Sequence, residues 1–198
     1  MESTSPQHFL TFLFLVLFYI NSASAARDPT SKINSEFIRT ACKDTTYPKL
    51  CFSSLSSHAN TIQTSPHLLA STALNVTLSS AKSTSDTMLK LSRSHGIKPR
   101  EAAAMRDCIE ELNESVTEIQ RSIGEMRKLK ERDFKEMVSD VQTWVSAALT
   151  DENTCSDGFQ GSNMNGDLKT LVRRQIVNVA QLTSNALALI NRYAILHG

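Results

Sequence analysis

The chain has 198 residues, with 21 Lys and Arg against 20 Asp and Glu and a formal net charge of +1. This length suits one domain, or at most two small ones, with a core of ordinary size. The near-neutral balance argues against a nucleic-acid-binding protein, because such domains usually carry a clear basic excess.

The first 25 residues are typical of a secretory signal peptide. Residues 9–20 (FLTFLFLVLFYI) are almost wholly apolar, but at ~1.5 Å per residue this run is too short to span a bilayer comfortably. The small-x-small pattern of residues 23–25 suits signal peptidase, although no Lys or Arg precedes the apolar run. We therefore expect cleavage after Ala25 or Ala26, with an uncleaved anchor as the alternative. The product would be a secreted domain, residues 26–198, without membrane attachment.

Export also explains the cysteines and two candidate modification sites. An even number of cysteines behind a signal peptide predicts two disulfides. Three pairings are possible. The spacing favours one bond between cysteines close together in the sequence and one between cysteines far apart. Asn75-Val-Thr and Asn113-Glu-Ser are N-glycosylation sequons. The four cysteines are Cys42, Cys51, Cys108 and Cys155.

A small helical hairpin is expected at about residues 33–57. Helical turns fit residues 35–41 and 49–55, and Tyr47-Pro48 interrupts the chain between them. A segment this short cannot hold itself together by burial alone, which gives a physical reason for a Cys42–Cys51 crosslink.

Four longer helices are expected between about residues 66 and 196. The clearest begins at Pro99 and carries apolar residues from Met105 to Met126 with gaps that alternate between four and three, a single stripe on a helix. Another begins after Asp133, a good N-cap residue, and the link after it, from about residue 151 to 166, would contain Cys155. We interpret Trp144 as a core residue. No run alternates with period two, so the sequence predicts an all-α, antiparallel four-helix bundle. The helices are expected at about residues 66–94, 99–127, 134–150 and 167–196.

The sequence does not carry a recognisable catalytic constellation. No pair of residues has the spacing of a zinc or di-iron site, and no nucleophile elbow or phosphate loop occurs. The acidic run Asp107, Glu110, Glu111 and Glu114 is most simply a solvated helix face, although contact with a partner is an alternative. We therefore expect no enzyme, no metal and no cofactor. The histidines that follow the expected signal peptide fit surface positions at helix ends and links: His58, His67, His95 and His197.

Three segments resemble one known family, the plant invertase/pectin methylesterase inhibitors. Residues 38–51 (IRTACKDTTYPKLC) resemble its N-terminal signature. Residues 104–112 (AMRDCIEEL) and 141–159 (VQTWVSAALTDENTCSDGF) resemble its third- and fourth-cysteine motifs. The three motifs occur in order and together place all four cysteines.

This resemblance implies a four-helix bundle with an N-terminal hairpin and the disulfides Cys42–Cys51 and Cys108–Cys155. It also implies a protein that is not an enzyme but binds a cell-wall enzyme reversibly, one to one, over its active-site cleft, in the apoplast. Invertase inhibitors typically carry Pro-Lys-Phe in the C-terminal half, whereas this chain has no proline after Pro99. The branch that inhibits pectin methylesterase is therefore the favoured interpretation.

Two alternatives remain at this point. One is an inhibitor of cell-wall or vacuolar acid invertase, and the more remote one is a secreted helical ligand-binding or signalling protein. The same domain also precedes pectin methylesterase catalytic domains, but this chain ends at Gly198, so we expect it to stand alone.

In the family, the target-facing surface comes from the middle helices and the turn around the fourth cysteine. Carried onto matching positions, this nominates Thr154 and Asp157, with Thr150, Glu110 and Glu114 as further candidates. The simpler alternative is that Thr154 and Asp157 only cap a helix end and shape a loop.

Overall fold

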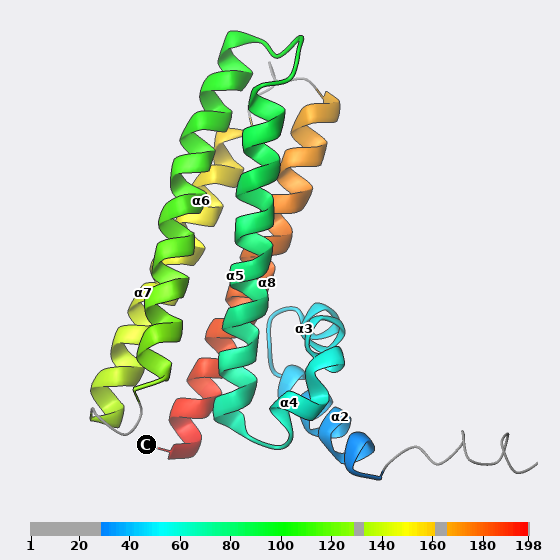
Figure 1. Ribbon diagram of the computed structural model, residues 1–198, viewed down its shortest axis with the longest axis vertical. Coiled ribbons are helices and arrows are strands. Elements are labelled where there is room, and N and C mark those ends of the chain that lie inside the picture. The colour runs from blue at the N-terminus through cyan, green and yellow to red at the C-terminus, as the bar shows by residue number, and fades with distance from the viewer. Residues whose placement is uncertain (1–28, 129–132, 161–165, 198) are drawn as a thin grey trace, which may run out of the picture.

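The computed structural model describes residues 29–128, 133–160 and 166–197, and these residues are helical with short links. The expected signal peptide lies outside the described residues. Each long helix packs against two others, so that α5 lies diagonally opposite α7 and α6 opposite α8. Figure 1 shows this bundle with the N-terminal helices beside one end of it, and the all-α four-helix prediction is confirmed. The long helices are α5 (Pro66–Ser92), α6 (Pro99–Met126), α7 (Phe134–Gly158) and α8 (Gly166–His197).

The N-terminal unit contains more helix than the sequence indicated. Its elements are α2 (Pro29–Cys42), α3 (Pro48–Leu55), the 3-10 turn η1 (Ser56–His58) and α4 (Ala59–Ile62). Ile38 and Ile62 are fully buried, so α2 and α4 are stabilised by packing against the rest of the unit and the bundle rather than by their own length.

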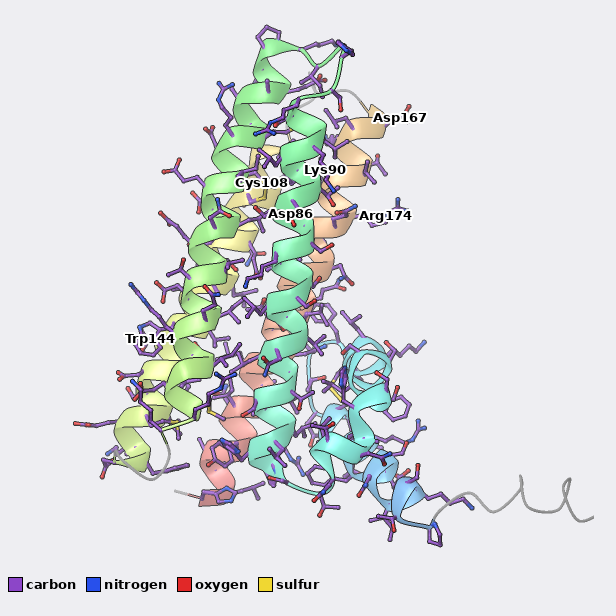
Figure 2. The ribbon with its side chains drawn as sticks, in the orientation of Figure 1. Asp86, Lys90, Cys108, Trp144, Asp167 and Arg174 are labelled. Atoms are coloured by element: carbon purple, nitrogen blue, oxygen red, sulfur yellow. A yellow bond between two sulfur atoms is a disulfide. The ribbon has the colours of Figure 1, made fainter. Side chains whose placement is uncertain are left out.

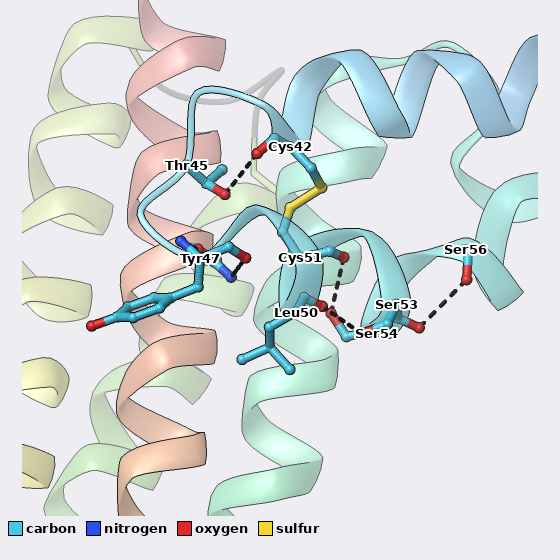
Figure 3. Close-up of a disulfide and its surroundings, with 9 residues drawn as sticks. Cys42, Thr45, Tyr47, Leu50, Cys51, Ser53, Ser54 and Ser56 are labelled. Carbon is cyan, nitrogen blue, oxygen red and sulfur yellow. Dashed lines mark hydrogen bonds between the residues drawn. A yellow bond between two sulfur atoms is a disulfide. The ribbon is translucent and has the colours of Figure 1, made fainter.

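A disulfide and a buried amide are among the contacts that hold this unit in place. The Cys42–Cys51 disulfide joins α2 to α3, and the Thr45 hydroxyl donates to the Cys42 carbonyl oxygen at 2.9 Å (Figure 3). On α8, the Asn185 side chain accepts from the Tyr47 backbone N–H and donates to the Tyr47 carbonyl oxygen, both at 3.0 Å. A single buried amide thus satisfies both backbone groups at the bend between α2 and α3.

The helix starts follow the expected chemistry. The Ser65 hydroxyl caps α5 by accepting from the Leu68 backbone N–H at 3.3 Å. The Asp133 carboxylate caps α7 by accepting from two backbone N–H groups. Gly96, in the link from α5 to α6, has a φ of +84°, a conformation that glycine adopts without steric cost.

A buried polar layer lies between two apolar clusters along α6 and α7. Glu152 of α7 is fully buried, and its Oε1 accepts from the Ser115 hydroxyl of α6 at 2.7 Å and from the Thr183 hydroxyl of α8 at 2.8 Å. The larger apolar cluster lies on the side of this layer nearer the hairpin and includes Ile119, and the smaller lies on the other side and includes Leu112. We call Ser115, Glu152 and Thr183 the polar layer.

Helix α7 is longer than expected. It continues to Gly158, so Cys155 lies inside it rather than in the link that follows. The Cys108–Cys155 bond therefore joins two helices directly, with a Cα–Cα distance of 4.4 Å. Phe159, just after the helix, is fully buried in the smaller cluster, which favours helix over the turn suggested by the local composition. Trp144 is only half-buried, on the flank of α7 (Figure 2), and not the core residue we expected.

An aromatic cluster closes the hairpin end of the bundle. The Tyr193 ring lies 5.4 Å from Phe134, 5.6 Å from His67 and 4.7 Å from His197, between ring centroids. His67 Nε2 also lies 3.0 Å from the Met126 carbonyl oxygen. His67 and His197 therefore pack against Tyr193, a role that their positions at helix ends did not predict. Of the helices described, none combines the length and the apolar character needed to cross a membrane.

Candidate functional site

Three of the five nominated residues form one exposed stripe on α7. Thr150, Thr154 and Asp157 are spaced by four and three and all are exposed, so they share a helix face. The Thr154 hydroxyl donates to the Thr150 carbonyl oxygen at 2.9 Å, and the Thr150 hydroxyl donates to the Ser146 carbonyl oxygen at 3.0 Å. Both hydroxyl hydrogens are thus used within the helix, and the hydroxyl oxygens remain as acceptors.

Asp157 also stabilises the end of α7. Its carboxylate accepts a hydrogen bond from the Gln160 side-chain amide, just beyond the helix. The simpler interpretation of Asp157, as a residue that shapes a helix end, is therefore supported for this contact. The side chain is nevertheless exposed and carries its charge on the same face as Thr154.

The other two nominated residues, Glu110 and Glu114, are exposed one turn apart on α6. Both line a groove of about 680 Å³ along α6, which Ala147 and Asp151 of α7 border. Glu110 also lines a second groove, of about 720 Å³, together with Thr154 and both cysteines of the Cys108–Cys155 bond. The fold thus brings Glu110 and Thr154 to one groove, whereas Thr150 and Asp157 line neither of the two. We call the two grooves with the Thr150–Thr154–Asp157 stripe the α6–α7 face.

This face is rich in carboxylates. Carboxylate oxygens of Glu111, Glu114 and Asp151 all lie within 4.8 Å of one another. Partial burial raises the pKa of Asp151 to about 6, and the charges of Glu111, Glu114 and Glu118 add to this rise. Burial and neighbouring acids also raise the pKa of Glu111. Of the described residues, these three acids form the one group with the geometry to hold a cation. Exposed acidic groups are common without an ion, and we assign none here.

Glu152, which follows Asp151 in the chain, is a buried carboxyl with a different environment. Burial, the largest effect, raises the pKa of Glu152 to about 7, while the hydrogen bonds from Ser115 and Thr183 act in the opposite direction. The charge of Asp151 adds a smaller rise. Neither Asp151 nor Glu152 was identified from sequence. Continuing the four-and-three spacing of Val145 and Ala148 leads to Glu152 and Cys155, so the signal for a buried acid was present.

The two sequons lie on different grooves. Asn113 is exposed and lines the 680 Å³ groove of α6. Asn75 is exposed on α5, in a groove of about 850 Å³ whose other walls come from α3, η1 and α8. In both sequons the third residue is buried: Thr77 is 1 % exposed and Ser115 is fully buried.

Comparisons with known proteins agree with this architecture. A family model described as "Plant invertase/pectin methylesterase inhibitor" matches residues 36–189. The chain is 48% identical to "Pectinesterase inhibitor 11" of Arabidopsis thaliana, over 92% of this chain and 94% of that protein. It is 46% identical to a "21 kDa protein" of Daucus carota, over 94% and 96% of the two chains.

A solved structure has the same fold. The crystal structure of a mutant form of a pectin methylesterase inhibitor from Arabidopsis superimposes with a TM-score of 0.63 at 21% identity, over 78% of this chain and 95% of that one. At this level of identity the likeness concerns the fold alone.

Proposed function

The chain belongs to the plant invertase/pectin methylesterase inhibitor family, and on that premise we propose that it is a secreted inhibitor of pectin methylesterase. It binds the enzyme reversibly and without covalent chemistry, one molecule to one, and covers the active-site cleft. By doing so in the apoplast or cell wall it regulates the de-esterification of pectin. The observation that carries this proposal is similarity along almost the whole chain to proteins named pectinesterase inhibitors.

The α6–α7 face is the surface we propose for target binding. The carboxylates of Glu110 and Glu114 and the hydroxyl oxygen of Thr154 supply hydrogen-bond acceptors, and Arg100, Arg106 and Arg121 line the same two grooves as donors. The Cys108–Cys155 bond ties α6 to α7 beneath one of the grooves. A rigid surface loses little conformational entropy when it binds, so fixed acceptors and donors can select a complementary surface on the enzyme.

A titration tests the proposal. The mature protein, with both disulfides intact, is titrated into a plant pectin methylesterase and, in parallel, into an acid invertase, and both activities are followed from pH 5 to 7. We expect saturable, reversible inhibition of pectin methylesterase at one equivalent. Inhibition of invertase alone, or of neither enzyme, would overturn it.

Substitutions on the stripe test the surface. The double variant Thr154→Ala, Asp157→Ala should weaken inhibition by about tenfold, since loss of contacts worth ~1.4 kcal/mol has that effect. Arg174→Ala is the matched control, because Arg174 is exposed on α8 in the groove that contains Asn75 (Figure 2). A folded double variant that inhibits as well as the wild type would remove both residues from the interface.

A further inference from the structure

Asn113 lies on the α6 part of the α6–α7 face, on the side toward α5. It follows Glu110 by three residues and precedes Glu114, and all three line the same groove. Its Oδ1 accepts from the Ser85 hydroxyl of α5 at 3.1 Å. That bond uses the oxygen of the amide and not the nitrogen, so it is compatible with a sugar attached to Nδ2.

We propose that an N-linked oligosaccharide at Asn113 blocks target binding, whereas the same modification at Asn75 leaves binding intact. This inference rests on the proposed function and adds a means of controlling it. In the modification, the asparagine amide nitrogen attacks the anomeric carbon of a lipid-diphosphate-linked oligosaccharide. The new C–N bond forms as the C–O bond to the diphosphate breaks. The lipid diphosphate leaves with the electron pair, and the amide nitrogen loses one proton.

The position of Asn113 makes the block steric. A standard protein–protein interface buries about 800 Å² per partner, equivalent to a disc roughly 16 Å in radius. Residues three apart on a helix have Cβ atoms only ~5–6 Å apart. Any footprint of that size centred near Glu110 therefore includes Asn113, and a bulky, solvated oligosaccharide there holds the two surfaces apart.

Asn75 provides the internal comparison. Its groove is walled by α3, η1, α5 and α8, with no residue from α6 or α7. Its Nδ2 donates to the Ser71 carbonyl oxygen at 2.7 Å, and a substituted amide keeps one N–H for that bond. An oligosaccharide at Asn75 therefore extends from a different side of the bundle.

Burial of the third sequon residue determines when modification happens. Ser115 is fully buried and its hydroxyl donates to Glu152 in the polar layer. Thr77 is buried as well, with its hydroxyl bonded to the Ala73 carbonyl oxygen. A transferase that reads Asn-x-Ser/Thr must reach that hydroxyl residue, so it acts on the chain before the bundle closes. The population is thus divided during folding into chains that bind the target and chains that do not.

The test compares glycoforms of one sequence. The protein is secreted from a eukaryotic host, glycoforms are separated, and occupancy at each sequon is assigned by peptide mass with Asn113→Gln and Asn75→Gln as references. We expect the glycoform modified at Asn113 to require at least roughly tenfold more protein for half inhibition of pectin methylesterase, a loss of ~1.4 kcal/mol in binding. Asn75→Gln should leave the inhibition by each glycoform unchanged.

Different outcomes overturn the inference and the proposed function. Equal inhibition by the two glycoforms refutes the block, and no occupancy at Asn113 refutes control of binding by modification at this site. An oligosaccharyltransferase should modify the reduced, unfolded chain much faster than the folded, unglycosylated protein. Equal rates refute the claim that modification precedes closure of the bundle. The same sequence made in a bacterial host and folded with both disulfides must inhibit pectin methylesterase. If it does not, the proposed function fails, independently of the sugar.

Discussion

Replacing Glu152 with glutamine removes a titratable charge from the polar layer while keeping the size of the side chain. In the wild type this carboxyl is fully buried, and burial raises its pKa from 4.5 to about 7. The folded state therefore holds the proton more tightly than the unfolded chain, whose carboxyl has the ordinary pKa. Glutamine resembles the protonated form, because it keeps an oxygen that accepts from Ser115 and Thr183 but carries no charge.

The magnitude follows from linkage. A gap of about 2.5 between the two pKa values, at ~1.4 kcal/mol for each unit, corresponds to about 3 kcal/mol of unfolding free energy. Because the folded-state pKa is the higher one, this stability is fully present below pH 4.5 and declines as the pH rises through about 7. The contribution from Glu152 should fall by about 2 kcal/mol between pH 5 and pH 7.5.

Urea unfolding followed by circular dichroism, with both disulfides intact, measures this contribution at several pH values. The informative quantity is the difference between wild type and Glu152→Gln, because Asp151 also has a raised pKa and adds a pH dependence of the same sign. Gln120→Ala, which alters an exposed residue of α6 without a titratable group, is the control and should keep the wild-type slope. Parallel pH profiles for wild type and Glu152→Gln would refute the reasoning that burial raises this pKa.

Two further predictions concern stability. Asn185→Ala should lower the free energy of unfolding by about 1–3 kcal/mol, because the backbone N–H and C=O of Tyr47 lose their partner. A urea titration beside Asn191→Ala, which removes only an exposed side-chain bond, provides the measurement, and equal losses would contradict it. Replacing Cys108 and Cys155 by serine should cost about 4 kcal/mol, against about 2.5 for the hairpin disulfide, because the bonds span 47 and 9 residues. Thermal or urea unfolding of the two double variants compares them, and the opposite order would exclude the chain-entropy explanation.

Much of the bundle could be predicted because its signals are local. The four-and-three spacing along α6, its start at Pro99 and the cap at Asp133 depend only on neighbouring residues, and they correctly indicated where α6 and α7 begin. The end of α7 could not be found this way. The segment DENTCSDG has the composition of a turn, but Cys155 and Phe159 are buried in the smaller apolar cluster. Packing at that end outweighs the weak local preference for a turn.

The sequence predicted individual residues of the candidate site but not how they are arranged in space. The exposed positions of Glu110 and Thr154 follow from helix periodicity, but their presence in one groove depends on how α6 packs against α7. Asp151 was missed for the same reason, since its raised pKa arises first from burial between the packed helices and then from carboxylates on the neighbouring helix. Glu152 was missed because an acid at a core position conflicts with the expectation that such positions are apolar.

The two apolar clusters divide the bundle into regions that can open separately. The smaller cluster includes Met105, Phe159 and Ile176, and it lies at the end where Cys108 and Cys155 are joined. Native-state hydrogen exchange reports opening of such regions one by one. At this end the covalent bond adds a restraint to the apolar contacts, so we expect backbone amides of α6 and α7 near it to exchange faster by local fluctuation once the bond is reduced. We therefore expect the redox state of this single disulfide to change how long the adjoining surface of the bundle stays closed.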